Sequence, residues 1–193
     1  MAQIVTPSDS NLLLIASILK EGGVAIVPTD TVYGLVCHPS FPQAVERIRE
    51  IKHRDRDKPF QLLMASIDDV WKDGAMKTLT TERFASFWPG ALTLVLETHD
   101  GRTEGYRVPN DPQLQTLLQQ SGGALKATSV NISGEPPAIS FETIPSAILD
   151  AVDIVLDGGE IPTAEASTVL KISSKDGTRV LRSGVISRQL QLS

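Results

Sequence analysis

Apolar runs of strand length alternate with helix-length amphipathic segments, and this alternation limits the folds open to the 193-residue chain. Residues 24–28 (VAIVP) are almost wholly apolar, as expected of a strand covered on both faces. A helical segment precedes this strand, with Ser8, Asp9 and Ser10 as candidate N-caps, and ends at Gly22 and Gly23. The chain therefore starts with a helix that leads into a buried strand.

The same alternation continues to the C-terminal end. Helical periodicity recurs in residues 44–51, 80–90 and 111–123. Strand composition recurs in residues 60–65, 91–98, 125–130, 152–156, 167–172 and 178–182. Because the order is irregular and the strand-rich stretch comes last, we expect one α/β domain over residues 1–193, with its core at about 8–187 and helices flanking a mixed parallel and antiparallel sheet.

Composition excludes several classes of protein. Hydrophobic residues make up 41% of the chain, which is enough for an ordinary core, and the net charge of −5 disfavours coating of nucleic acid by the whole surface. Cys37 is the only cysteine, and the three histidines are scattered, so no metal site is predicted. No basic leader precedes the first apolar stretch, and no apolar run approaches the ~20 residues of a membrane span. We expect a cytoplasmic protein.

Several nucleotide-binding and nucleophile motifs are absent. The sequence has no G-x-x-x-x-G-K-[ST], no G-x-G-x-x-G after a strand and no G-x-S-x-G. If the chain is an enzyme, it is expected to act by positioning and electrostatics.

Residues 51–60 (IKHRDRDKPF) carry a row of cations. Positive charges recur at every second position: Lys52, Arg54, Arg56 and Lys58. In an extended segment these side chains share a face and suit a triphosphate. Alternatively, they complement the end of the preceding helix and pair with Asp55 and Asp57 in a solvated loop. The spacing alone leaves both interpretations open.

Two polar segments follow apolar strands. Ser129 and Asn131 are two residues apart at the end of a strand, where α/β proteins commonly bind ligands, although a self-bonded turn is the alternative. Residues 27–35 (VPTDTVYGL) place Thr31 and Tyr33 after a strand, where their hydroxyls suit a small polar ligand. The alternative there is an ordinary turn capped by Asp30, with Tyr33 in the core.

Taken together, these segments resemble the YrdC-like family, whose enzymes make threonylcarbamoyl-AMP. The matching motifs are PTDTVYGL, the K-x-R of residues 52–54, RDKPF, FWPGALTLVL, YRVPNDP, the S-x-N of residues 129–131, LDGG, ASTVL and LRSGVIS. The resemblance runs from about Gly22 to Ile186 and implies a YrdC-like fold with a basic concave cleft.

The resemblance also assigns a site. L-Threonine would lie near Thr31, Arg107, Ala127 and Ser167. ATP would lie against Lys52, Arg54, Lys58, Ser129, Asn131 and Arg182, with Lys52 and Arg54 as the catalytic cations. Bicarbonate would be the third substrate, and Mg²⁺ would arrive on the triphosphate. The product would serve modification of adenosine in tRNA, with tRNA and a downstream threonylcarbamoyl-transfer complex as partners.

The sequence departs from the family pattern at three positions. Val130 replaces a small residue, Ala166 a glutamate, and Leu63 a histidine that some relatives place near threonine. The chain resembles the short, single-domain type, and Asn131 distinguishes it from a paralogous branch that lacks this asparagine.

Two other functions remain as alternatives. A non-catalytic YrdC-like protein could bind RNA or tRNA in the same basic cleft, although the acidic total charge and 5% aromatic content disfavour it. A related carbamoyl-transfer domain occurs in hydrogenase-maturation proteins, which are longer chains with zinc and acylphosphatase segments.

Overall fold

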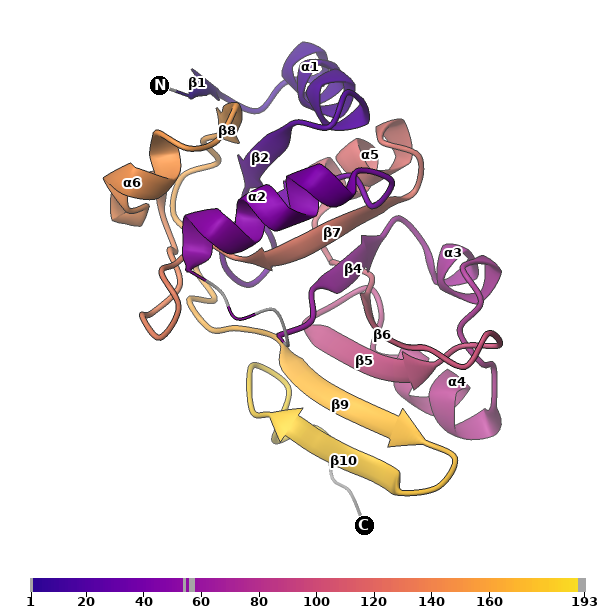
Figure 1. The fold of residues 1–193 in the computed structure, drawn as a ribbon. Coiled ribbons are helices and arrows are strands. Elements are labelled where there is room, and N and C mark those ends of the chain that lie inside the picture. The colour runs from indigo at the N-terminus through magenta and orange to yellow at the C-terminus, as the bar shows by residue number, and fades with distance from the viewer. Residues whose placement is uncertain (1, 54, 56–57, 191–193) are drawn as a thin grey trace.

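The computed structural model describes residues 2–53, 55 and 58–190, and these form one ten-stranded sheet (Figure 1). The strand order across the sheet is β1-β8-β2-β3-β7-β4-β6-β5-β9-β10. In chain order the strands are β1 (Gln3–Val5), β2 (Val24–Val27), β3 (Gly34–Cys37), β4 (Gln61–Met64), β5 (Leu92–Glu97), β6 (Thr103–Arg107), β7 (Ala124–Ser129), β8 (Ile154–Leu156), β9 (Thr168–Ser173) and β10 (Gly177–Arg182).

The described helices fall between these strands. They are α1 (Asp9–Lys20), α2 (Pro42–Lys52), α3 (Ile67–Lys72), α4 (Leu79–Ala85), α5 (Pro112–Gln120) and α6 (Ser146–Leu149), with a 3₁₀ turn η1 (Phe141–Thr143). The predicted N-cap Ser8 accepts a hydrogen bond from the backbone N–H of Asn11 at 3.2 Å. Pro112 occupies the first turn of α5 behind the cap Asp111, which accepts from the N–H of Leu114 at 2.8 Å.

The predicted mixed sheet is confirmed. Strand pairs β1–β8, β2–β8, β4–β6 and β5–β9 are parallel, and β2–β3, β3–β7, β4–β7, β5–β6 and β9–β10 are antiparallel. The sequence prediction missed the strands β1, β3 and β6 and the helices α3 and α6. β6 reads TEGYR, whose glutamate and glycine are poor strand formers.

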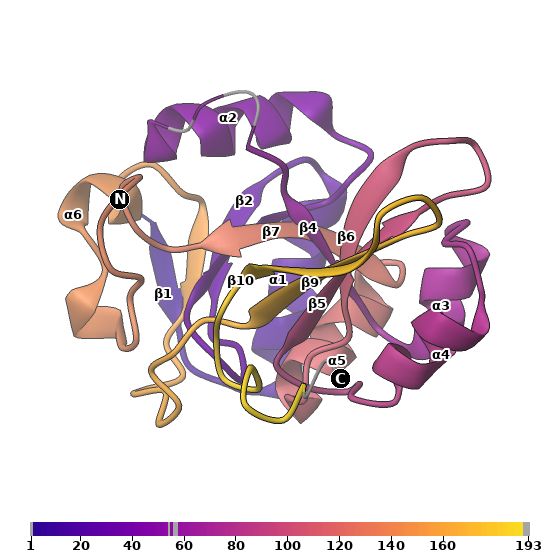
Figure 2. The ribbon, with the colours of Figure 1, turned by 90° about the horizontal axis from the view of Figure 1, so that it is seen from below.

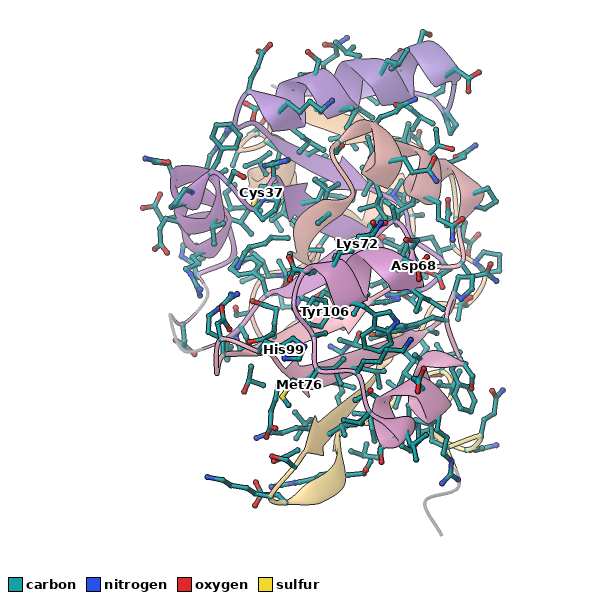
Figure 3. The ribbon with its side chains drawn as sticks, turned by 90° about the vertical axis from the view of Figure 1, so that its right-hand side faces the viewer. Cys37, Asp68, Lys72, Met76, His99 and Tyr106 are labelled. Atoms are coloured by element: carbon teal, nitrogen blue, oxygen red, sulfur yellow. The ribbon has the colours of Figure 1, made fainter. Side chains whose placement is uncertain are left out.

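One face of the sheet is covered by helices along most of its width. Cys37, Lys126, Leu62, Tyr106 and Leu94 lie in register across β3, β7, β4, β6 and β5, so their side chains share this face. Helices α2 and α6 pack on it over the first strands, and α3 and α4 over the later ones. Figure 3 shows α3, which carries Asp68 and Lys72, in front of the strand that carries Tyr106.

The opposite face is only half covered. Helices α1 and α5 pack over β8, β2, β3 and one end each of β7 and β4, where the strand side chains are apolar. Figure 2 shows α2 on one side of β7 and both α1 and α5 on the other. Over the rest of β7 and β4, and over β6, β5 and β9, the described helices leave this face uncovered, and a cavity lies there.

Candidate active site

A cavity of about 470 Å³ lies over the uncovered half of the sheet. Its floor is made by residues of β7, β4, β6, β5 and β9, and its rim by Thr31, the segment Lys58–Phe60 and Arg182. A recess of about 20 Å³, lined by Leu63, Arg107 and other residues, shares several wall residues with the cavity. The cavity is therefore the part of the fold in which a small ligand fits between strands far apart in sequence.

Arg107 lies at the inner end of the cavity and is 2% exposed. Its Nε donates to the carbonyl of Gly90 at 3.1 Å, Nη1 donates to Thr31 Oγ1 at 2.9 Å, and Nη2 forms an ion pair with Asp30. Burial lowers the pKa of Arg107, while Asp30 acts in the opposite direction. Since a guanidinium has five N–H donors, two remain for a carboxylate ligand.

The turn at residues 29–33 fixes Thr31 at the edge of Arg107. Thr29 Oγ1 donates to the carbonyl of Val32 at 2.7 Å and accepts from the backbone N–H of Thr31 at 3.1 Å. Both interpretations of this segment hold in part, because Thr31 lines the cavity while Tyr33 is fully buried in the core. The Tyr33 hydroxyl donates to the carbonyl of Gly159 at 2.7 Å, and burial raises the pKa of Tyr33.

Arg182 also lies on the rim of the cavity and is bonded to Ser167. Its Nη2 donates to the Ser167 carbonyl at 2.9 Å and to Ser167 Oγ at 3.1 Å. Partial burial lowers the pKa of Arg182. Ser167 Oγ is in turn 2.9 Å from Thr93 Oγ1, whose hydroxyl donates to Gln61 Oε1 at 2.8 Å. The guanidinium and the strand floor are thus joined by one chain of hydrogen bonds.

Lys52 does not begin an extended row of cations, so that expectation is wrong at this position. Helix α2 continues through Lys52, and the helical period places Lys52 in line with Ala44 and Ile48 on the buried side. The Lys52 ammonium donates to the carbonyl of Ser129, and to the carbonyl and Oδ1 of Asn131 at 2.8 and 2.9 Å. It does not line the cavity. Its assignment as an ATP-binding, catalytic cation stays a prediction.

Asn131, like Lys52, is not among the residues that line the cavity. Its Nδ2 donates to the carbonyls of Ile132 and Glu135, both at 2.9 Å, and its Oδ1 accepts from Ser129 Oγ at 2.6 Å. The self-bonded turn offered as an alternative for this segment therefore forms, while Ser129 itself lines the cavity.

Lys58 lines the cavity mouth and also pairs with Asp55. Its Nζ lies 3.0 Å from Asp55 Oδ2, and its side chain is 53% exposed. Such an exposed pair contributes little to stability and leaves the ammonium able to exchange partners. Arg54 and Arg56 lie outside the described residues, so their predicted roles stay predictions.

Most of the predicted site residues meet in this cavity. Those that line it are Thr31, Lys58, Arg107, Ala127, Ser129, Ser167 and Arg182. Sequence reasoning missed the floor residues Gln61, Thr93, Thr103 and Gly105. For Gln61 and Thr93 the signal was a polar residue in an otherwise apolar run, whereas β6, which carries Thr103 and Gly105, has no such pattern. Of the departures from the family pattern, Ala166 lines the cavity, Leu63 lines the recess, and Val130 is buried on the α2 side.

Two absences can be stated for the described part of the chain. No group of three His, Cys, Asp or Glu side chains there is placed to hold a metal ion. Within the same residues, no helix combines the length and apolar character needed to cross a bilayer.

A mixed α/β sheet with a cationic and hydroxyl-lined cavity on an uncovered face defines a small-ligand-binding α/β protein. The chain belongs to the Sua5/YciO/YrdC family, since that family model, described as "Telomere recombination", matches residues 17–184.

Relatives of known name are similar over most of this chain. The threonylcarbamoyl-AMP synthase of Bacillus subtilis is 31% identical over 198 residues, covering 96% of this chain and 56% of the relative. A putative threonylcarbamoyl-AMP synthase of Methanocaldococcus jannaschii is 30% identical, covering 89% of this chain and 84% of the relative. The chain spans only 56% and 64% of the Bacillus subtilis and Rattus norvegicus synthases.

Solved structures agree with the fold. Pyrococcus abyssi Sua5 complexed with L-threonine superposes with a TM-score of 0.86 at 29% identity, covering 95% of this chain and 57% of that one. Escherichia coli YciO superposes with a TM-score of 0.83 at 26% identity, covering 96% of this chain and 97% of that one.

Proposed function

We propose that this chain is a threonylcarbamoyl-AMP synthase that joins L-threonine, bicarbonate and ATP and releases pyrophosphate. One observation carries the proposal: a single cavity is lined by the four residues assigned to threonine and by three of those assigned to ATP. The names of its relatives and the threonine complex of a similar structure support the same assignment.

In the proposed reaction, the amine of threonine bonds to the carbon of bicarbonate, and water leaves to give a carbamate. A carbamate oxygen then attacks the α-phosphorus of ATP, and the bond to the bridging oxygen breaks with release of pyrophosphate. This reaction needs no nucleophile from the protein. The task of the site is to hold anions together and to stabilise the charge that develops on phosphate oxygens.

At the inner end of the cavity, Arg107 would bind the threonine carboxylate with its two remaining N–H donors. Thr31 and Ser167 would contribute hydroxyls, and Ala127 would leave room for the substrate beside β7. Because Asp30 already pairs with Arg107, the guanidinium is held in place before the ligand arrives.

Of the other residues that line the cavity, Lys58, Ser129 and Arg182 would contact the phosphates, and Mg²⁺ would accompany the triphosphate. Lys52 and Asn131 keep their assignments to ATP on the basis of the family motifs, Lys52 as a catalytic cation, and they also fix the strand end at Ser129. Arg54 keeps its assignment to the phosphates on the basis of the family motif alone. We further propose that the enzyme works in the cytoplasm and that its product passes to a threonylcarbamoyl-transfer complex acting on tRNA.

The direct test measures pyrophosphate release by the purified chain with ATP and Mg²⁺, with and without L-threonine and bicarbonate. We expect release only when both co-substrates are present. Release that is independent of either one would overturn the proposal. Salt-sensitive binding of tRNA without ATP turnover would favour the RNA-binding alternative.

A pair of variants tests whether the cavity performs this reaction. Arg182→Met should lower kcat/KM about 10²-fold, because a donor to developing phosphate charge is lost. Lys72→Met removes the same charge from an exposed helix on the other face of the sheet and should leave the rate unchanged. Equal effects of the two changes would argue against the cavity as the active site.

A further inference from the structure

Gln61 stands on the floor of the cavity with small neighbours on both sides. On β4 it lies opposite Ala127 of β7 and Gly105 of β6. Neither neighbour has a side chain beyond Cβ, so the Gln61 side chain is not enclosed by its strand neighbours. It lines both the main cavity and the inner recess.

A hydrogen-bond chain sets the orientation of the Gln61 amide. Gln61 reaches across β6 at Gly105 and accepts from Thr93 Oγ1 on β5 at 2.8 Å. Because the single hydroxyl hydrogen of Thr93 goes to Gln61, the 2.9 Å contact with Ser167 must be a donation from Ser167 to Thr93. Ser167 Oγ then accepts from Arg182, which can only donate.

All four groups therefore point their hydrogen bonds in one direction, from Arg182 to Gln61. This direction uses the amide oxygen of Gln61 and leaves the Nε2 end for other partners. Among the described residues, no acceptor bonds to Nε2, although the side chain lines the cavity. An amide N–H₂ on a cavity floor is a donor suited to a ligand oxygen.

Strand register places Gln61 between the two ends of the site. Arg107 lies in register with Leu63, two residues along β4 from Gln61, on the side assigned to threonine. Ser129 lies two residues beyond Ala127 on β7, on the side assigned to phosphate. Two residues of a strand span about 6.6 Å. Along the strand direction, Gln61 is therefore about that far from the level of Arg107 and about that far from the level of Ser129.

We propose that Gln61 Nε2 binds the group that joins the two substrates, a carboxyl oxygen of the bicarbonate-derived carbamate. This inference rests on the proposed function and adds a substrate-contacting residue to it. The neutral amide donates a hydrogen bond without taking up or losing a proton. It would orient the carbamate so that the other oxygen faces the α-phosphorus. Arg182, through Ser167 and Thr93, would then position the amide.

Gln61→Glu is the sharpest test, because a carboxylate can still accept from Thr93 but cannot donate to a carbamate. Two quantities should be measured: kcat/KM for bicarbonate in buffers freed of dissolved carbon dioxide, and calorimetric binding of L-threonine without bicarbonate. We expect kcat/KM for bicarbonate to fall about 10²-fold, as for loss of one oxyanion donor. The Kd for threonine should stay within a factor of about three, because Arg107 makes that contact.

Two further variants guard this result. Gln61→Met removes the donor without adding charge and should also weaken bicarbonate use, which keeps the inference testable if the Glu variant does not fold. Gln113→Glu makes the same charge change on the exposed side of α5 and should behave as wild type.

The outcomes separate the inference from the proposed function. If wild-type protein shows no release dependent on threonine and bicarbonate, the proposed function fails. If wild type is active and Gln61→Glu or Gln61→Met keeps wild-type bicarbonate dependence, the inference alone is overturned. A variant that loses threonine binding as strongly as bicarbonate use would also overturn it, because the amide would then act at the amino-acid end.

Discussion

The two halves of one sheet face differ in the polarity of the side chains that they present. Where α1 and α5 cover the face, the strand residues beneath them are apolar, as at Ala25, Val36 and Leu125. Where the described helices leave it uncovered, the floor carries Gln61, Thr93 and other small or polar residues. Burial of apolar side chains in the covered half stabilises the fold. The open half buries less apolar surface under helices and forms the cavity instead.

The boundary between the halves crosses two strands. Leu63 and Gln61 point to the same face of β4, yet the first packs in the core and the second lines the cavity. On β7, Leu125 is in the core and Ser129 is in the cavity, with Ala127 between them contributing to both. The same backbone is therefore held rigid at one end by packing and presents ligand-facing groups at the other.

Arg107 lies at this boundary, in register with Leu63 and lining the cavity. Replacing it should have the largest effect on both activity and stability. In Arg107→Met, kcat/KM for threonine should fall about 10²–10³-fold, because the carboxylate partner is lost. The free energy of unfolding should also fall by about 3–5 kcal/mol, because Asp30 keeps a buried charge without its partner. Steady-state kinetics and urea unfolding measure the two effects separately.

Adding Asp30→Asn to Arg107→Met distinguishes the two roles of the ion pair. The double variant should regain much of the lost stability, since no lone charge stays buried, and should remain inactive. Recovery of activity in the double variant would show that Arg107 serves only the fold.

A core substitution in the covered half should change stability without changing catalysis. Leu117 of α5 is completely buried, and Leu117→Ala should lower the free energy of unfolding by about 2–5 kcal/mol. Val169→Ala, on the cavity wall, should cost about 1 kcal/mol or less, because its side chain is only partly buried. Folded Leu117→Ala protein should keep wild-type kcat/KM; a large loss would mean that the two halves are coupled.

Each half of the sheet was predicted from sequence only in part. In the covered half, helices α1 and α5 follow from apolar periodicity and their caps, and β2 and β8 are continuous apolar runs, but β3 was missed. β6 was missed, because a strand whose inward residues are Thr103 and Gly105 lacks the alternation by which strands are recognised. In β6, therefore, the residues that form the cavity floor replace the apolar alternation by which a core strand is recognised.

The prediction that Lys52 lies in an extended segment also failed because of the local pattern. Spacing of two predicts a shared face only in an extended chain, whereas α2 extends to Lys52 and imposes the helical period. Assignment of Arg107 depended on the resemblance of YRVPNDP, since nothing in its local pattern marks a buried guanidinium. Which residue completes a cavity depends on pairing between distant strands, and a single sequence does not give that pairing.

Ser167→Ala should have a smaller effect than the loss of Arg107. The change removes an acceptor for Arg182 and the donor to Thr93, so the side chains of Arg182 and Thr93 each lose one hydrogen bond that fixes their orientation. We expect kcat/KM to fall about tenfold, a change in free energy of about 1.4 kcal/mol that lies within the range for losing such side-chain hydrogen bonds. The exposed hydroxyl of Ser86, which donates to Arg83, offers a matched control, and Ser86→Ala should leave kcat/KM unchanged. If the rate of Ser167→Ala is unchanged, the hydrogen-bond chain from Arg182 to Gln61 has no role in catalysis.

The smallest effect, and the clearest contrast, concerns thiol reactivity. Burial raises the pKa of Cys37 from 9.0 to about 12, so at pH 8 the folded protein should hold about 10³-fold less thiolate than an exposed cysteine. Cys37 should therefore resist thiol reagents while the protein stays folded, keep full activity, and react once urea unfolds it. A cysteine introduced in the open half by Val95→Cys, in a Cys37→Ala background, should react in the folded state and lose activity as it does. If ATP and L-threonine together fail to slow its modification, the open half of the sheet is not where the substrates bind.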